Sequence, residues 1–411
     1  MRHSIVISAL VLITKALIGQ NSEFVLVNGT ELSLTSGCVA ALVNGGLVNE
    51  GGTLANAGDL TIEGNLINSG EVNGGGAAGM YRLMENLEHN GTMTPHQSTF
   101  ELYGGDQAIM GVTPADFFNL TLIGTGRKVM LNDANVNGTL AINDRILDTR
   151  SYTLYHRNPD PASITYDDGV GFSRSDAGGG LSRETNASAE YIFPVGDDVE
   201  QFRYRPVMVR PSQSSPNTYK VRMANQEPPF RNLLAPDIYF ITLYFYHKVE
   251  RLNGASPAEL AFSYLPSEDG TYQGMAYLST TSNEWEKDAD ATDGPTLSSN
   301  PDQVSFTTAN WSDFSSTDHA LASYTSDVWV PNIFSPNEDG ENDVFKAYAT
   351  NIRDFKMKIW DRWGKLMFEG DNIEIGWDGT HNGTRLNTGV FVYTIEGNGT
   401  LLLKGDVTLV R

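Results

Sequence analysis

The stretch ALVNGGLVNEGGTLANAGDLTIEGNLINSGEV, residues 41–72, repeats one short phrase. LVNGG begins at Leu42, LVNEG at Leu47, LANAG at Leu54 and LINSG at Leu66. Each phrase has an apolar residue, an Asn two positions later and a Gly two positions after that, which is typical of short strands that turn at Asn or Gly. Strands that cannot bury a face alone stack on one another, so the phrase predicts a β-solenoid-like region. A flexible Gly-rich arm, above all at residues 74–76, is the alternative interpretation.

The same pattern continues downstream with larger apolar residues. STFELYG, FFNLTLIG and ANVNGTLAIND, from residue 98 onward, alternate apolar and polar residues and close at Gly, Asn or Asp. These segments resemble the stalk repeats of large surface proteins of the Bacteroidetes group. A Pro-rich sequence follows His156, so we expect the repeat region at residues 21–157.

The middle of the chain also reads as strands. TYKVRMA, LAFSYLP and QVSFTTANW predict a β-sandwich passenger domain at residues 158–325. Residues 238–247, IYFITLYFYH, are nearly all apolar or aromatic, which predicts a strand at the centre of the sandwich with both faces covered. We therefore expect its aromatic side chains in the core rather than on a platform that stacks sugars.

The N-terminal 20 residues have the pattern of a signal peptide. Arg2 and His3 precede an apolar run at residues 5–13, and small residues follow. We expect cleavage at Gly19/Gln20 or Gln20/Asn21. The apolar run is too short for a stable membrane anchor, and no later run reaches eighteen apolar residues, so we expect no transmembrane segment in the mature chain.

Composition limits the class of protein and its partners. The 411 residues include 28 basic and 50 acidic ones, a net charge of −22 that argues against nucleic acid as a partner. The 41 glycines favour strands and tight turns, because Gly reaches positive φ, and we expect almost no helix. Cys38 is the only cysteine, which excludes an internal disulfide, and we expect it to be a small buried apolar residue.

The sequence carries no motif for catalysis or for a cofactor. It has no nucleophile motif, phosphate-binding loop or zinc spacing, so we predict no catalytic or cofactor-binding residues and no enzyme activity. A glycosidase would need two carboxylates across a cleft. Asp133, Asp144 and Asp148 are available for this, yet each stands where a turn would use Asp.

An Asn- and Asp-rich segment near the C-terminus has two interpretations. Ca²⁺ prefers six to eight oxygen ligands, and carboxylate and amide oxygens alternate here around Gly340. The alternative is a tight turn whose Asn and Asp side chains cap backbone N–H groups without an ion. The candidate metal ligands are Asn337, Asp339, Glu341, Asn342 and Asp343.

The last fifth of the chain resembles a known family. PNIFSPNEDGENDVF, IWDRWGKLMFEG, WDG, GVFVYTI and KGDVTLVR resemble the gliding-motility-associated C-terminal domain, the type B sorting domain of the type IX secretion system. We place this domain at residues 326–411. Its alternating apolar residues predict an immunoglobulin-like β-sandwich, so the whole chain is expected to be all-β.

The resemblance also implies partners. It implies passage through the type IX translocon and pairing with an outer-membrane protein of the PorP/SprF family, so that the protein is secreted or attached at the cell surface. Family members commonly have an aromatic-Asn pair where this chain has Trp360 and Asp361; Asp can still make that turn. The residues that we expect to contact a partner are Arg362, Trp363, Gly364, Lys404 and Arg411.

Two details of this domain remain open at the level of sequence. Trp363 would either form a contact surface on a hairpin turn or pack beneath Arg362 to complete the core. The terminal KGDVTLVR, which contains Lys404 and Arg411, is expected to be an edge strand read by a partner.

Two functions follow from these patterns. The first is a non-enzymatic surface protein with an adhesin-like or structural passenger. The second is a secreted protein that binds or degrades polysaccharide, and a glycan or another cell-surface ligand is a candidate partner in either case. A cleft with paired carboxylates or exposed coplanar aromatic rings would favour the second function.

Overall fold

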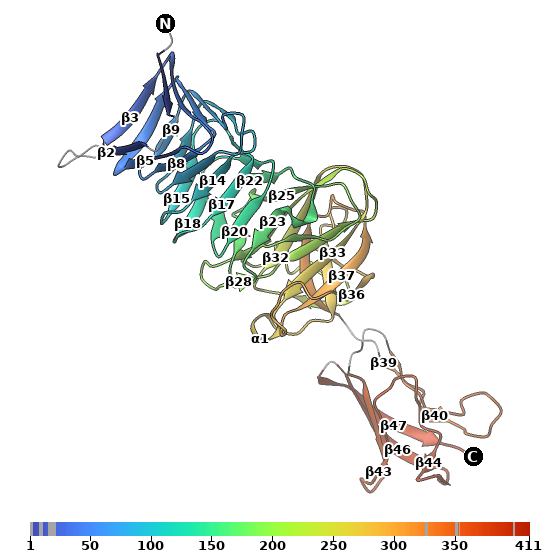
Figure 1. Ribbon diagram of the computed structural model, residues 1–411. Coiled ribbons are helices and arrows are strands. Elements are labelled where there is room, and N and C mark those ends of the chain that lie inside the picture. Colours follow the sequence, from blue (N-terminus) through green and yellow to red (C-terminus); the bar gives the residue numbers. More distant parts are fainter. Residues whose placement is uncertain are drawn as a thin grey trace. The chain divides into compact units, whose positions relative to one another are not determined.

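The computed structural model describes residues 3–7, 11–14, 22–324, 328–349, 352, 354–397 and 399–411. Strands make up 52% of it and helices 2%, which confirms the all-β class. The chain divides into two compact units (Figure 1): residues 1–233 with 242–321, and residues 234–241 with 322–411. Each unit is described by itself below.

The first unit begins with a parallel β-solenoid of about seven turns, as the repeats predict. Three strands form each turn, and the strands of successive turns stack into three faces, drawn in blue to green in Figure 1. The first face contains β1 (His3–Ile7), β4 (Thr30–Leu34), β7 (Thr53–Asn56), β10 (Glu71–Asn73) and β13 (Thr92–Thr94), followed by β16 (Ala115–Phe117), β19 (Ala134–Val136), β22 (Thr153–His156) and β25 (Gly180–Thr185). The second face contains β2 (Val11–Thr14), β5 (Val39–Val43), β8 (Asp59–Ile62), β11 (Met80–Leu83), β14 (Thr99–Leu102), β17 (Asn119–Leu122), β20 (Leu140–Asn143) and β23 (Ile164–Tyr166). The third face contains β3 (Ser22–Val27), β6 (Gly45–Glu50), β9 (Leu66–Asn68), β12 (Leu87–His89), β15 (Gln107–Met110), β18 (Arg127–Met130), β21 (Ile146–Asp148) and β24 (Phe172–Arg174).

Apolar side chains at every second strand position fill the interior of the solenoid. In β8, β11, β14 and β17 every second side chain is buried. The register aligns Leu60, Tyr81, Phe100 and Leu120 in one inward ladder. The rings of Tyr81 and Phe100 stack with centroids 4.4 Å apart, so these aromatic side chains belong to the core.

The recurring Asn has a more specific role than a turn at the surface. Asn49 and Asn68 are fully buried, and Asn49 Nδ2 donates to Asn68 Oδ1 at 2.8 Å. In the next turn Asn68 Nδ2 lies 3.1 Å from His89 Nδ1. Asn68 Oδ1 also accepts the N–H of Gly70 at 3.2 Å, which explains the spacing of Asn and Gly in the phrase. At Asn49 and Asn68 the phrase therefore encodes an internal ladder of polar side chains, whereas Asn44 is an exposed turn residue with φ +54°.

The glycines of the solenoid allow neighbouring turns to approach each other closely, and some also take a positive φ. A Cβ added to Gly70 would lie 2.3 Å from Gly52 O, and one added to Gly91 would lie 2.1 Å from Gly70 O. Neither residue has a positive φ, whereas Gly76 has φ +78° with open space around it, as expected of a turn. The turns of the solenoid thus approach each other too closely for a side chain at Gly70.

The first face of the solenoid continues into the middle of the chain. β25 pairs in parallel with β22 and antiparallel with β30 (Asn217–Ala224). The sheet goes on through β32 (Tyr246–Asn253), β38 (Asp318–Tyr324), β34 (Gly274–Leu278) and β35 (Trp285–Lys287), and β31 (Ile238–Ile241) pairs with β38. The boundary expected after residue 157 therefore lies within a shared sheet.

A second sheet packs on the same core. It contains β26 (Tyr191–Phe193), β29 (Val207–Pro211), β33 (Ala258–Tyr264), β37 (Val304–Trp311) and β36 (Ala291–Asp293). This part of the chain also contains four short elements. They are the 3-10 helix η1 (Pro161–Ser163), the paired strands β27 (Gly196–Asp197) and β28 (Arg203–Tyr204), and the helix α1 (Pro266–Asp269). Val209 and Phe262 share one hydrophobic cluster with Tyr219 and Val249 of the first sheet. The finer description of this part as a β-sandwich stays a prediction.

The prediction that residues 238–247 form one fully covered strand was wrong. β31 ends at Ile241, and β32 begins only at Tyr246. Tyr239 is 71% exposed and Tyr244 is 48% exposed, while Ile241 and Phe245 are buried. Because the chain bends between two short strands, half of its apolar residues face solvent.

Two predictions for the N-terminal part have different outcomes. Cys38 is buried, as expected. The signal peptide stays a prediction, because the expected cleavage points lie outside the described residues and residues 3–7 and 11–14 are strands of the solenoid. Among the residues that the structure describes, no helix is long and apolar enough to cross a membrane.

The second unit has its own core beneath a five-stranded sheet. The sheet runs in the order β40 (Ile333–Phe334), β47 (Thr400–Leu409), β46 (Gly389–Gly397), β42 (Lys356–Trp360) and β43 (Leu366–Gly370). Two short pairs accompany it: β39 (Val328–Trp329) with β41 (Tyr348–Ala349), and β44 (Thr380–His381) with β45 (Thr384–Arg385). Met357, Ile359 and Ile395 face the core, as the alternation predicts, and the immunoglobulin-like detail stays a prediction.

The expectation that the last strand is an edge strand was wrong for its C-terminal end, where β40 pairs with Thr408 and Leu409. β47 lies between β46 and β40, because Ile333 and Phe334 pair in parallel with Thr408 and Leu409. The sequence shows β47 as the last strand but cannot show that a two-residue segment 75 positions earlier returns to pair with it.

Buried histidines link the stability of the first unit to pH. Burial lowers the pKa of His89, that of His247 to about 4 and those of His156 and His319 to about 3, from an ordinary value of 6.5. The unfolded chain therefore binds protons below pH 6.5 that the folded chain does not. The free energy of unfolding should decrease as the pH falls from 6.5 towards these folded-state values.

We expect the variant His319→Phe to weaken this dependence. Both ring nitrogens of His319 lack a hydrogen-bond partner, and the ring stacks on Phe262 at 4.8 Å. Between pH 7 and pH 5 the wild type should lose about 1–2 kcal/mol more than the variant. Thermal and urea unfolding at both pH values measures this, with the exposed His96→Asn as control. An equal loss in His319→Phe and wild type would contradict the assignment.

We expect Gly70→Ala to destabilise the solenoid by about 1–3 kcal/mol, because the added Cβ overlaps the backbone of the preceding turn. Gly105→Ala is the matched control, since the nearest atom to its added Cβ is Thr125 Oγ1 at 3.9 Å. Thermal unfolding followed by circular dichroism compares the two. Equal melting temperatures would mean that the turns can separate without cost.

Candidate functional site

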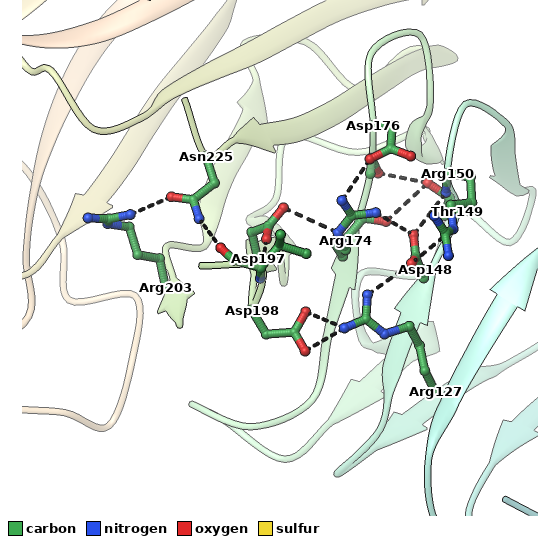
Figure 2. Close-up of polar contacts among 12 residues, drawn as sticks. Arg127, Asp148, Thr149, Arg150, Arg174, Asp176, Asp197, Asp198, Arg203 and Asn225 are labelled. Atoms are coloured by element: carbon green, nitrogen blue, oxygen red, sulfur yellow. Dashed lines mark hydrogen bonds and ion pairs between the residues drawn. The ribbon is translucent and has the colours of Figure 1, made fainter. Parts of the chain in front are cut away.

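A network of charged residues joins the last turns of the solenoid to the loops that follow them (Figure 2). Asp148 is its centre, and its side chain is fully buried. Arg174 Nη1 lies 2.9 Å from Asp148 Oδ1, Arg127 Nη1 lies 3.0 Å from Oδ2, and Arg150 Nε lies 3.2 Å from Oδ2. Burial alone would raise the pKa of Asp148, but the hydrogen bonds from Arg127 and Arg174 outweigh burial and lower it.

Strand register places these residues together. Asp148 ends β21 and Arg174 ends β24, and the two residues are paired across the third face of the solenoid. Arg174 then reaches Asp176 at 2.7 Å and Asp197 at 3.3 Å, as Figure 2 shows. One guanidinium therefore holds three segments of the chain in place.

A polar hollow of about 480 Å³ opens beside this network. Three segments line it: residues 174–177 after β24, residues 197–200 after β27, and residues 222–226 at the end of β30. The charged lining residues are Arg174, Asp176, Asp197, Glu200 and Arg222. Below, "the Arg222 hollow" means this space.

Two groups hold the wall of the Arg222 hollow. Asn225 Nδ2 donates to Val199 O at 3.0 Å and to Gln201 O at 3.2 Å. Asp197 Oδ1 accepts the Val199 N–H at 2.7 Å. Burial raises the pKa of Asp197, partly offset by that hydrogen bond and by the charge of Arg174. The loop at residues 197–200 is thus fixed from both ends.

The three carboxylates considered for polysaccharide cleavage do not form a pair. Asp148 is enclosed by arginines, and Asp133 Oδ1 accepts the Thr153 N–H at 2.8 Å, which is a role in a turn. Asp144 forms an ion pair with its neighbour Arg145 at the surface. The absence of enzyme activity stays a prediction.

Sequence reasoning missed the Arg222 hollow. Arg222 lies in the strand TYKVRMA, where a basic residue near the end of a buried strand was a usable signal. Asp176 begins the Gly-rich loop at residues 176–180, and Asp197 lies in the phrase FPVGDD. These residues are 21 to 46 positions apart, and only the sheet register brings them together.

We expect Asp148→Asn to destabilise the first unit by about 3–5 kcal/mol, because it removes the buried carboxylate that the nearly buried Arg174 shares with the partly exposed Arg127. Asp144→Asn removes an ion pair whose carboxylate is 49% exposed, and should cost less than about 1 kcal/mol. Urea unfolding and limited proteolysis compare the two variants. A loss no larger for Asp148→Asn would show that the network is replaceable.

The Asn- and Asp-rich segment of the second unit is an exposed turn. Asp343 Oδ1 accepts the N–H groups of Asn337 at 2.9 Å and Glu338 at 2.7 Å, and Oδ2 accepts that of Gly340 at 2.8 Å. These hydrogen bonds, led by that from Gly340, lower the pKa of Asp343. Asp339 Oδ1 accepts the Glu341 N–H at 2.8 Å.

This geometry fits the interpretation as a capped turn. Asn342 has φ +55°, a conformation in which Asn is common. Within the described ranges of the chain, no group of three or more His, Cys, Asp or Glu side chains is placed to hold a metal ion. Ca²⁺ binding stays a prediction.

The turn between β42 and β43 displays Trp363. Asp361 Oδ1 accepts the N–H groups of Trp363 and Lys365, each at 2.9 Å, and Gly364 takes φ +82°. The Trp363 side chain is 86% exposed. The interpretation that Trp363 packs beneath Arg362 and completes the core was therefore wrong, and the contact-surface interpretation fits.

Apolar residues adjoin this turn on the outer face of the sheet. Trp360 pairs with Leu366 across β43 and with Val392 across β46. Leu366 is 39% exposed, and Val390 and Val392 are each 47% exposed. We call Trp360, Leu366, Val390 and Val392 the apolar strip.

Lys404 and Arg411 have different surroundings. Lys404 is exposed and pairs with Thr394 on β46. Arg411 Nε donates to Leu386 O at 2.8 Å and Nη2 donates to Gly379 O at 3.1 Å, so this guanidinium is engaged within the domain. The structure brings Arg362, Trp363 and Gly364 together on one turn, and their role in partner binding stays a prediction.

Comparison with known proteins identifies this domain. Neither a search of curated proteins nor one of solved structures found a match for the chain. Residues 328–405 match the family model of the CHU_C type IX secretion signal domain, which confirms the resemblance seen in the sequence. Residues 328–405 are therefore a type IX secretion signal domain, and the protein that carries them is secreted or displayed at the cell surface.

Proposed function

We propose that this is a non-enzymatic cell-surface protein whose first unit is an adhesin-like or structural passenger. Residues 1–20 direct the chain to the periplasm as a signal peptide, and the C-terminal domain then docks on an outer-membrane protein of the PorP/SprF family after export. In this proposal the protein comes from a member of the Bacteroidetes group, and its secretion domain has an immunoglobulin-like fold.

The observation that carries the proposal is the exposed Trp363 within a matched secretion domain. Tryptophan is enriched among the residues that dominate binding energy, and a contiguous apolar surface is costly unless a partner covers it. The apolar strip continues that surface from the turn onto the sheet. Together they offer an anchor residue with an apolar rim.

The structural role of the passenger is supported by the interior of the solenoid. Tyr81, Phe100 and Phe117 are fully buried and contact one another, so they are not available as a platform for sugars. A stacked parallel solenoid is long and rigid for its mass, which suits a spacer or stalk.

A second candidate function is polysaccharide binding by the passenger. The Arg222 hollow favours it, because both donors and acceptors of hydrogen bonds line a space large enough for a small ligand. Polysaccharide cleavage is the less supported form of this alternative, since Asp133, Asp144 and Asp148 have structural partners.

We expect Trp363→Ser to lower the amount of protein at the cell surface about tenfold or more, because a central Trp anchor contributes about 2 kcal/mol or more to an interface. Its melting temperature should be unchanged, since the side chain is 86% exposed. Surface proteolysis and immunoblotting of cell fractions in a type IX-competent host measure export.

Two controls accompany this test. Trp329→Ser removes another exposed tryptophan, 61% exposed, away from the turn and should be exported normally. Deletion of residues 330–411 should leave a folded passenger inside the cell and defines complete loss. Normal surface levels of Trp363→Ser would show that the turn does not bind the export partner. Normal surface levels of the deletion variant would show that the C-terminal domain is not needed for sorting.

A further inference from the structure

Arg222 is a buried cation whose polar contacts are to a tyrosine. It is 8% exposed, and its polar contacts are a hydrogen bond from Nη2 to Tyr246 Oη at 3.5 Å and the face of the Tyr246 ring at 5.7 Å. In the part of the chain that the structure describes, no carboxylate forms an ion pair with it. A buried charge without a partner is costly, so this arginine needs an acceptor that the folded chain does not provide.

Neighbouring basic residues show the contrast. Arg174 contacts three carboxylates, and Arg205 contacts Asp269 at 2.6 Å. Lys248, directly across the sheet from Arg222, lies 3.6 Å from Asp318. Arg183, on the neighbouring strand β25, also has no ion pair among the described residues, but it donates to Ile192 O at 2.6 Å and to Pro161 O at 2.9 Å. Arg222 therefore differs from these residues in lacking a close acceptor.

The Arg222 hollow also presents acceptors. Asp176 keeps 38% of its side chain exposed although one oxygen contacts Arg174, and Glu200 is exposed at a residue with φ +65°. The positions of both are fixed by the loops that Arg174 and Asn225 hold, as Figure 2 shows for Asp176, Asp197 and Asn225. A fixed donor and fixed acceptors line one space of about 480 Å³.

We infer that the Arg222 hollow binds an acidic sugar unit of a polysaccharide, with the sugar carboxylate on the Arg222 guanidinium and sugar hydroxyl groups donating to Asp176 and Glu200. Guanidinium and carboxylate match as a bidentate pair. Hydroxyl groups can donate to a carboxylate, which a bare anion such as sulfate cannot do. This inference rests on the proposed surface location, where such polymers are accessible.

Charge explains why the ligand should be a sugar acid rather than a simple anion. Within the lining, Asp176, Asp197 and Glu200 outnumber Arg174 and Arg222, and the whole chain carries −22. A bare multivalent anion would be repelled by the acidic rim. A uronic acid places one carboxylate at Arg222 and neutral hydroxyl groups against the carboxylates.

The test uses the full chain and isothermal titration calorimetry at physiological salt. The probes are trimers of galacturonate, glucuronate, mannuronate and guluronate, a neutral galactose trimer, and sodium sulfate. We expect at least one uronate trimer to bind and the galactose trimer and sulfate to bind at least tenfold more weakly. No binding of any uronate trimer at millimolar concentration, or equal binding of the neutral trimer or sulfate, would overturn the inference.

Variants tie the binding to the site. Arg222→Gln should weaken uronate binding at least tenfold, and Glu200→Gln, at an exposed position, should weaken it severalfold with an unchanged melting temperature. Arg231→Gln is the control, because Arg231 is a half-exposed residue paired with Glu227 outside the hollow. Wild-type affinity in both Arg222→Gln and Glu200→Gln would overturn the assignment of the site.

The same variants separate this inference from the proposed function. Arg222→Gln should reach the cell surface in normal amounts, because the secretion domain is unchanged. Normal export of the wild type without uronate binding would contradict only the inferred ligand. Failed export of the wild type would contradict the proposed function.

Discussion

The first unit depends on the close stacking of successive solenoid turns. Each turn buries its apolar residues only against its neighbours, so the backbone spacing within the stack decides what fits. At Gly70 and Gly91 that spacing leaves no room for a Cβ, and at Asn49 and Asn68 it is short enough for one amide to donate to the next. The repeated phrase thus specifies contacts between turns as well as turns at the surface, such as the one at Asn44.

The buried charged groups inside this stack are tolerated because they find partners at fixed distances. Lys128 is fully buried and donates to Gly104 O, Gly105 O and Thr125 O and to Gln107 Oε1, and burial lowers its pKa to about 8. Asp148 is a buried anion, and the guanidinium groups of Arg127 and Arg174 form ion pairs with it. Such groups hold neighbouring turns in one register, since a shift would leave a buried charge unpaired. Arg222, in β30 beyond the stack, has no such close acceptor, and this marks the hollow beside it.

Much of the fold could be predicted from local patterns, and the site could not. The phrase at residues 41–72 identifies the solenoid because the period of a repeat is a local property. The Asp148 network requires residues 21 to 26 positions apart to meet, and small changes in turn length decide that. Residues 238–247 were misjudged for a related reason: composition predicts an apolar segment, but a bend after Ile241 turns Tyr244 to solvent.

The secretion domain shows how one residue type can serve either packing or display. Trp377 is 1% exposed, with Nε1 donating to Thr380 O at 2.8 Å and its ring against Phe391 at 4.8 Å, so it belongs to the core. Trp363 stands on a turn that Asp361 holds through two backbone N–H groups, both on Oδ1. A partner that contacts Trp363 therefore meets a backbone that is already ordered, which reduces the entropy lost on binding.

The same turn bears on the position where the resemblance implies Asn rather than Asp361. The turn uses a single side-chain oxygen, which both residues possess. The second oxygen of Asp361 adds a negative charge beside Arg362 and Lys365 without changing the backbone. The shape of the turn is thus kept while its charge differs, so a partner that reads the shape through Trp363 would accept either residue.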